Sequence, residues 1–279
     1  MVSINTNMTS MIVQKGLLNS SNALNSLMKS MASGYKLNKS SDNAANYAIS
    51  QALSSKISSL SVAEENANMG LDMVQSMSAV LELISKQTTR LRDLAEQSLN
   101  GTYGASSIEA MNTEAQSIID EIIRLTKDND FNEIAMFTEA EPVEGEEGTE
   151  PSNMIYLQIG IESGDDSRIS FNAYFSVSDI LKVADLGINN TDVLDIIDGF
   201  MEKLLSRQTE YGTVSNRLTS VLDSISVKYN NLVSSRSTLR DADAGELSSE
   251  YIRQQILQQA AATLLSTANQ TPAIALQLI

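Results

Sequence analysis

The chain has 279 residues and a formal net charge of −16. Because 42% of its residues are apolar, it can bury enough apolar surface to fold rather than stay disordered. It contains no Cys, His or Trp, which excludes disulfides and thiol chemistry and removes the usual ligands of zinc sites and the commonest general base. Residues 128 to 198 contain seventeen acidic residues and two basic ones. The sequence has no basic stripe of the kind that binds nucleic acid.

The N-terminal segment 4–31 is predicted to form a helix that other protein covers. Leu18, Leu24, Leu27 and Met31 are among the apolar residues near one side of this helix, and uncharged amides and hydroxyls flank them. A helix that faces water normally has a charged outer face. We therefore expect this segment to be covered on more than one side.

A long helix and a shorter partner are predicted next. Small or apolar residues recur at spacings of three and four from Leu53 to Ser98, which indicates one helix of about thirteen turns. Asn100 and Gly101 form a helix stop, and a second stripe follows over 108–125. Because the link between the two stripes is short, an antiparallel helical hairpin is favoured.

The middle of the chain is predicted to differ from both ends. The acidic stretch 139–150 is interpreted as a solvated loop, and it lacks the ligand spacing of a calcium loop. Apolar residues then alternate along 155–161, a turn is indicated at 163–166, and alternation resumes at 169–171. This pattern is typical of a β-hairpin.

Two more helices are predicted towards the C-terminus, over 204–239 and 247–268. The prolines at 142, 151 and 272 lie outside every predicted helix, and no apolar run reaches the roughly 20 residues needed to span a bilayer. The expected fold is mainly α: a long antiparallel helical bundle or coiled-coil rod formed by both chain ends, with a small β-hairpin region in the middle. Each apolar stripe is interpreted as bundle core.

Both ends of the chain resemble the bacterial flagellins. The N-terminal similarity includes ASGYKLNKSSDNAANYAIS (32–50) and LRDLAEQSLNGT (91–102), and the C-terminal similarity covers SSRSTLRDADAGELSSEYIRQQILQQAAATLLSTANQ (234–270). Asn46 stands where the family usually has Gly. Only a short segment separates the two ends, so the resemblance is to a minimal flagellin that lacks the large variable outer domains.

This resemblance implies a domain organisation. Residues 1–45 and 236–279 would form the terminal helical domain, which makes the inner tube of the filament. Residues 46–235 would form a helical rod domain, with the central acidic loop and β-hairpin at 129–178. The side chains expected to pack in the filament core are Leu18, Leu24, Leu27, Met31, Ile252, Ile256, Leu257, Leu264 and Leu265.

The function implied is that of a structural subunit of the flagellar filament, which self-assembles into a hollow helical polymer for swimming motility. Two alternatives stay open: a hook–filament junction protein, although NKSSDNAA lacks the two prolines usual in that family, and a minor flagellin that acts mainly as an adhesin or receptor ligand. No enzyme activity, cofactor or metal site is expected. The metalloprotease carried by some flagellins requires His, which this chain lacks.

The partners implied are other copies of the chain, an export chaperone at the C-terminal helix, and the hook-associated and cap proteins. Toll-like receptor 5 would bind a patch at Arg90, Leu94 and Glu114. The alternative interpretation is a surface ion pair between Arg90 and Glu114, with Leu94 flanking the core. Neither nucleic acid nor membrane insertion is expected. The filament would be extracellular, reached by type III export without a cleaved signal peptide.

One polar cluster at Lys39, Asp42 and Asn43 could suggest catalysis. No His, Cys or paired acid accompanies it in the sequence. A cap or turn that opens a helix near residue 43 is the favoured interpretation.

Overall fold

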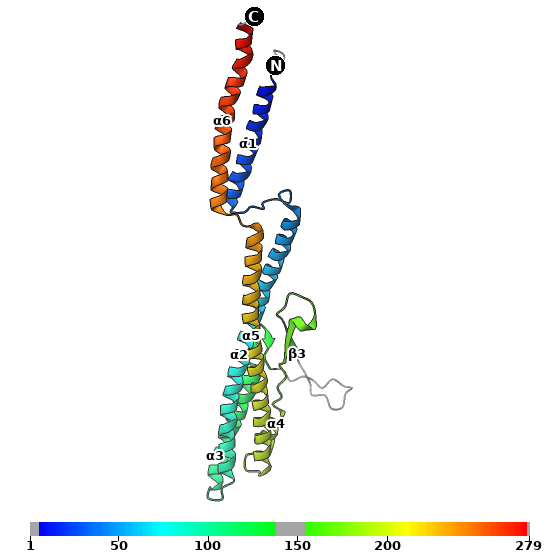
Figure 1. The fold of residues 1–279 in the computed structure, drawn as a ribbon. Helices are drawn as coiled ribbons and strands as arrows, with labels where there is room; N and C mark the ends of the chain where they lie inside the picture. Colours follow the sequence, from blue (N-terminus) through cyan, green and yellow to red (C-terminus); the bar gives the residue numbers. More distant parts are fainter. Residues whose placement is uncertain (1–5, 138–153, 278–279) are drawn as a thin grey trace. The chain divides into compact units, whose positions relative to one another are not determined.

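The computed structural model describes residues 6–137 and 154–277, which are mainly helical as predicted (Figure 1). The helices are α1 (Met8–Ser33), α2 (Ala44–Ser98), α3 (Ala105–Lys127), α4 (Ser178–Leu186), α5 (Asp192–Arg240) and α6 (Ala244–Gln277). The strands are β1 (Asp130–Phe131), β2 (Ile134–Ala135), β3 (Met154–Gln158) and β4 (Arg168–Asn172), and a 3-10 turn spans Asp165–Ser167.

The chain divides into two compact units, each described by itself. The terminal unit comprises residues 1–57 and 230–279, and the central unit comprises residues 58–229. The divisions therefore fall inside the long helices α2 and α5. The functional domain boundaries at 45/46 and 235/236 remain predictions.

In the terminal unit, α1 and α6 lie side by side and antiparallel (Figure 1). The start of α1 meets the far end of α6, where the side-chain amide of Asn7 donates to the carbonyl of Ala268 at 2.7 Å. At the other end of the pair, Tyr35 forms an antiparallel bridge with Asp241. The predicted helical rod formed by both chain ends is therefore present here as a pair of helices within one chain.

The core of the central unit is built from the predicted stripes. Along α2, the stripe residues from Leu60 to Ser98 are buried except Leu71, which is partly buried. The α3 stripe buries Ile118 and Ile122, and residues of α5 complete the core. The largest fully buried side chains of this unit are Tyr211, Phe171, Phe200, Met77, Leu81, Ile84, Leu91, Leu94, Ile119, Ile122, Ile180 and Ile188.

The predicted β-hairpin is confirmed. Strands β3 and β4 pair antiparallel, with Leu157 opposite Ile169, and the 3-10 turn lies in the connection. The hairpin lies so close to α2 that a Cβ added to Gly70 would be 2.3 Å from a methyl carbon of Leu157. The hydroxyl of Tyr211 in α5 donates to the carbonyl of Asn172 at 3.1 Å and fixes the other end of the hairpin.

Some elements were missed by the sequence analysis. The short helix α4 and the two-residue strands β1 and β2 were not predicted, and α6 continues past 268 through Pro272 to Gln277. The acidic stretch 139–150 lies outside the described residues. The predicted stop after α2 is confirmed, because Asn100 accepts a hydrogen bond from the Thr102 backbone N–H at 3.2 Å.

Candidate assembly surface

The ends of α1 are fixed by local sequence. At its start the side-chain oxygen of Asn7 accepts from the backbone N–H of Ser10 at 3.0 Å, as an N-cap residue does. At its end Gly34 takes a left-handed conformation with φ of +72°, which favours glycine. These two signals set where α1 begins and ends.

The contact between α1 and α6 buries little. Leu24, Ser20 and Ala268 are buried there, and Ser10 donates from its hydroxyl to the side-chain oxygen of Asn269 at 2.9 Å. Up to residue 270, the remaining apolar side chains of the two helices are only partly covered or face solvent. The pair is therefore joined by a narrow seam rather than by a broad core.

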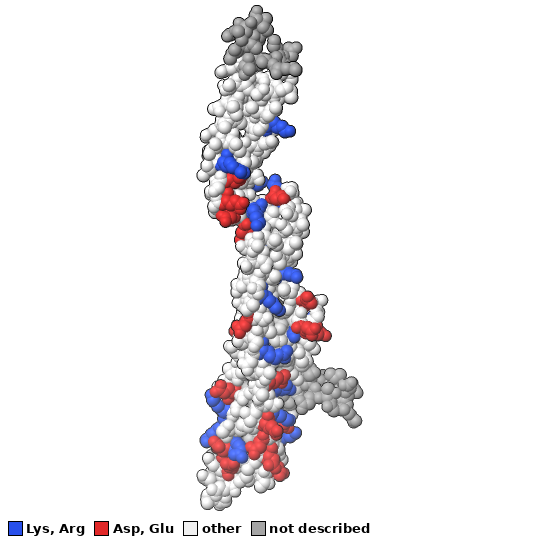
Figure 2. Space-filling model, in the orientation of Figure 1, with Lys and Arg blue, Asp and Glu red and all other residues white. Residues whose placement is uncertain are grey.

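A wide apolar surface remains on α1 and α6. Figure 2 shows few charged residues over these two helices. The exposed hydrophobic residues there are Met8, Met11, Ile12, Leu18, Met28, Met31, Ile252, Ile256, Leu257 and Leu264, each at least 46% exposed. Gly16 and Ala23 of α1 and Ala261 of α6 help to line a groove of about 530 Å³ between the helices. Contiguous exposed apolar surface of this kind marks a site of association.

The nine side chains predicted to pack in the filament core have different surroundings in the single chain. Leu24 is buried, and Leu27 and Leu265 are partly buried. The other six are exposed: Leu18, Met31, Ile252, Ile256, Leu257 and Leu264. Their role in a filament core is untested by one chain and remains a prediction.

The connections to α1 and α6 are joined by a cluster that sequence reasoning missed. Lys36 donates its backbone N–H to the carbonyl of Arg240 at 2.8 Å, and Ala242 donates to the carbonyl of Gly34 at 3.0 Å. The guanidinium of Arg240 lies 4.2 Å from the ring centroid of Tyr35, a cation–π contact. No helical or strand period links residues about 200 positions apart, so periodicity could not reveal this contact.

The polar cluster near residue 40 is a helix start, as predicted. One carboxylate oxygen of Asp42 accepts backbone N–H groups from Lys39 and Asn38, both at 2.9 Å, and these bonds hold the pKa of Asp42 below its ordinary value. The side-chain oxygen of Asn43 accepts from the backbone N–H of Asn46 at 3.0 Å. These polar groups are used to begin α2.

The structure brings together two of the three residues in the predicted receptor patch. Both Nε and Nη2 of Arg90 donate to one carboxylate oxygen of Glu114, at 2.9 and 2.7 Å, and both side chains are about half exposed. Leu94 is only 1% exposed and lies in the core. The patch that one chain presents to solvent therefore consists of Arg90 and Glu114.

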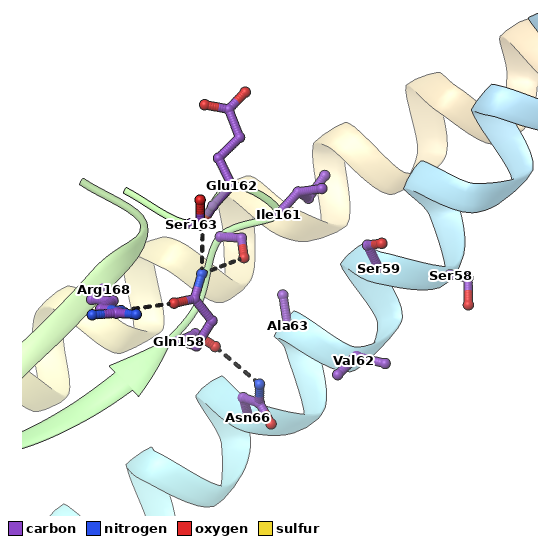
Figure 3. Close-up of a pocket in the computed structure, with 11 residues that line it drawn as sticks. Ser58, Ser59, Val62, Ala63, Asn66, Gln158, Ile161, Glu162, Ser163 and Arg168 are labelled. Atoms are coloured by element: carbon purple, nitrogen blue, oxygen red, sulfur yellow. Dashed lines mark hydrogen bonds between the residues drawn. The ribbon is translucent and has the colours of Figure 1, made fainter. Parts of the chain in front are cut away.

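A pocket of about 420 Å³ lies between α2 and the β3–β4 connection (Figure 3). Gln158 occupies its centre: its side-chain nitrogen donates to the carbonyls of Gly160 and Glu162, and its side-chain oxygen accepts from Arg168 at 3.1 Å. The backbone carbonyl of Gln158 accepts from Asn66 of α2 at 3.0 Å. The polar groups at the centre of the pocket thus satisfy one another and hold the hairpin connection.

Over residues 6–137 and 154–277, no three acidic side chains gather where they could hold a metal ion. A search of the described helices likewise finds none long and apolar enough to cross a membrane. The dominant feature is the apolar surface of α1 and α6.

Two paired helices from opposite ends of the chain, with their apolar side chains in solvent, define a subunit of a larger assembly. Comparison with known proteins specifies which one. The profile of the bacterial flagellin N-terminal helical region matches residues 4–141, and that of the bacterial flagellin C-terminal helical region matches residues 194–279. The chain belongs to the bacterial flagellin family.

Individual relatives match over the full chain. The flagellar filament 33 kDa core protein of Treponema phagedenis is 28% identical, and flagellin FlaB2 of Treponema pallidum is 27% identical. A flagellin of Halalkalibacterium halodurans is also 27% identical. Each alignment covers 99% of this chain and 99% of the relative. The similarity therefore includes the middle of the chain, and the minimal form is shared with these relatives.

Membership in this family confirms the predicted function: the protein is a structural subunit of the bacterial flagellar filament, and it polymerises with copies of itself. The hook–filament junction and adhesin alternatives are not favoured by these matches. The family is one of structural proteins, and its filament is extracellular.

Proposed function

We propose that α1 and α6 make the contacts that polymerise this filament subunit. The observation that supports the proposal is the set of apolar side chains that the pair leaves in solvent, including Ile256 at 59% and Leu264 at 58% exposure. Burying a fully exposed Leu or Ile contributes about 1.5–3 kcal/mol. Several such side chains covered by neighbouring copies would offset the entropy of ordering each added subunit.

The domain assignment follows from the same argument. Residues 1–45 and 236–279 would form the inner tube, where copies surround one another, and 46–235 would form the outer part. The distribution of charged residues supports this arrangement, because α1 and α6 display few charges and most of the described ion pairs lie in the central unit. Charged side chains are costly to bury unless they are paired.

Further partners belong to this proposal. An export chaperone that covers the apolar face of α6 before assembly would protect Ile252, Ile256 and Leu257 from premature association. Hook-associated and cap proteins would contact the same helices at the two ends of the filament. Export by a type III route without a cleaved signal, and the absence of enzyme activity, are proposed with the same function.

Receptor binding is proposed for the exposed pair of Arg90 and Glu114. Two hydrogen bonds to one carboxylate oxygen hold the guanidinium in place on the helix surface. Leu94 would contribute by supporting this surface from beneath, because its side chain is buried. Toll-like receptor 5 would then bind the side chains of Arg90 and Glu114.

A pair of substitutions tests the role of α6. Purified Ile256→Gln/Leu264→Gln protein is monomerised by heat, seeded or treated with ammonium sulfate, and examined by negative-stain electron microscopy beside the wild type. The control is Leu205→Gln in α5, since Leu205 is 54% exposed and lies in the central unit. Tubes are expected from the wild type and the control and not from the double variant. Normal tubes from the double variant would refute the proposal.

A further inference from the structure

Four exposed methionines lie on α1. They are Met8, Met11, Met28 and Met31, and each is at least 46% exposed. We call these four residues the α1 methionines. Helix α6, which pairs with α1, contains no methionine in its sequence. The thioethers of the helix pair therefore all belong to one helix and face solvent in the single chain.

The methionines of the central unit differ widely in exposure. Met73, Met77 and Met136 are at most 4% exposed and belong to its core. Met69 and Met154 are 54% and 39% exposed. The same chain therefore contains accessible thioethers on both units and protected ones in the core, which gives an internal comparison for any reagent that attacks sulfur.

Thioethers are the sulfur groups that an oxidant meets in this protein. The sequence has neither cysteine nor tryptophan, so no thiol or indole competes for the reagent. With hydrogen peroxide, the sulfur of methionine forms a bond to one peroxide oxygen, the O–O bond breaks, and the other oxygen leaves as water. The sulfur is oxidised by two electrons and the peroxide is reduced. Because an exposed thioether is open to the reagent, the α1 methionines are accessible to this reaction, whereas Met77 is enclosed.

A sulfoxide changes the surface that α1 presents. Oxidation converts a flexible apolar side chain into a polar one, whose oxygen accepts hydrogen bonds from water. The neighbouring exposed side chains of α1 are apolar and include Ile12 and Leu18, at 69% and 61% exposure. Covering a sulfoxide together with such side chains removes its water without supplying a donor, which costs free energy. Oxidation therefore opposes any contact that buries this face of α1.

We propose that the α1 methionines are oxidation sites of the unassembled subunit, and that their conversion to sulfoxides by peroxide blocks polymerisation. The inference rests on the proposed role of α1 and α6 in assembly. A neighbouring copy that covers α1 also excludes the oxidant, so the same methionines are protected in the filament. Methionine sulfoxide reductases reverse the reaction with a dithiol, which becomes a disulfide while the sulfoxide oxygen leaves as water. The modification is reversible and acts before assembly.

Peptide mapping tests which methionines react. Monomers and filaments are treated with hydrogen peroxide, quenched with catalase and digested with trypsin. The tryptic fragments 1–15, 16–29 and 30–36 carry different members of the set, so fragment masses and their fragmentation spectra locate each added oxygen. In monomers the α1 methionines should each gain one oxygen, while Met77 stays unoxidised. In filaments their oxidation should be much slower, and equal rates in monomers and filaments would overturn the proposal.

Seeded polymerisation tests the consequence. Oxidised wild-type monomers should need a concentration at least about tenfold higher than untreated monomers to form filaments, because each covered sulfoxide loses its hydrogen bonds to water. Treatment with methionine sulfoxide reductases and dithiothreitol should restore the original concentration. Circular dichroism before and after oxidation checks that the helices are intact. Oxidised monomers that assemble as readily as untreated ones would overturn the proposal.

A matched pair of variants assigns the effect to α1. The first replaces all four α1 methionines with leucine, an exchange between apolar side chains of similar volume, and it should polymerise equally well before and after peroxide treatment. The second carries Met69→Leu and Met154→Leu, which remove two exposed methionines of the central unit, and it should stay sensitive. Inhibition of the first variant by peroxide, or resistance of the second, would contradict the assignment.

Two smaller variants decide the assignment if four leucines prevent assembly by themselves. Met8→Leu/Met11→Leu and Met28→Leu/Met31→Leu each keep half of the α1 methionines, and peroxide should inhibit each less than the wild type. Inhibition of both to the wild-type extent would place the sensitive groups elsewhere. Failure of the underlying assembly role has a different signature: it is indicated by normal tubes from Ile256→Gln/Leu264→Gln, whereas normal tubes from oxidised wild-type protein refute the oxidation sites alone.

Discussion

The central and terminal units differ in where their apolar side chains lie. The central unit encloses Phe200, Tyr211 and Ile84 so fully that each is at most 1% exposed. In the described part of the terminal unit, the buried hydrophobic residues are Leu24, Leu37, Ile57 and Ala268, while ten hydrophobic residues of α1 and α6 are largely exposed. The central unit is therefore stabilised by its own core, whereas the terminal unit leaves most of its apolar side chains uncovered in the single chain, and we propose that neighbouring subunits bury them.

The largest expected effect separates the two units directly. Phe200→Ala should lower the free energy of unfolding of the monomer by about 3–5 kcal/mol, because it leaves a cavity beside Phe175, whose ring centroid lies 5.5 Å away. Ile256→Ala, at a residue 59% exposed, should change it by less than about 0.5 kcal/mol. Urea unfolding followed by circular dichroism measures both. An equal loss of unfolding free energy in the two variants would contradict the difference in burial between the two units.

A smaller effect on stability is expected where Gly70 of α2 packs against the hairpin of the central unit. Gly70→Ala should destabilise the monomer by about 1–3 kcal/mol, because the added Cβ meets Leu157 at 2.3 Å and the hairpin must shift. The matched control is Gly199→Ala in α5, where no atom lies within 4 Å of the added Cβ. That change should stabilise the helix by about 0.5–1 kcal/mol. Thermal unfolding of both variants gives the sign, and a stabilised Gly70→Ala would contradict the packing described.

The smallest expected effect is a pH dependence of the central unit. Hydrogen bonds from Lys203 and Lys182 lower the pKa of Asp179, and partial burial opposes them. Because the folded pKa lies below the unfolded one, the stabilisation is present above the unfolded pKa and is lost as pH falls through the folded pKa. Asp179→Asn should therefore lower the melting temperature at pH 7 slightly and flatten its decline in acid. A decline as steep as that of the wild type would show that Asp179 does not contribute.

The helices could be predicted because their cores follow one period. Ile84 and Leu91 are buried at spacings that the sequence alone reveals, and the stop at Asn100 depends on local chemistry. The short helix α4 was missed because its two buried residues, Ile180 and Val183, are too few to establish a period. A window of that size cannot distinguish a short helix from a loop.

The candidate surface was predictable in kind but not in detail. Uncharged apolar segments at both ends predict that other protein covers α1 and α6. Ile256 and Leu264 are exposed in the single chain, and their coverage by other copies stays a prediction. The contact between Tyr35 and Arg240 could not be predicted, because it depends on the folded path of two distant segments. The burial of Leu94 likewise depends on how α2 is rotated against its neighbours, which sequence spacing leaves open.

The hydrogen bond from Asn7 to Ala268 selects one alignment of α1 against α6. In a regular α-helix the carbonyl of Ala268 would accept the N–H of residue 272, but that residue is Pro272, which has no N–H to donate. Asn7 supplies the missing donor at 2.7 Å. If α1 slid along α6 by one residue, this acceptor would be left empty. Pro272 and Asn7, from opposite ends of the chain, thus together favour one alignment of α1 along α6.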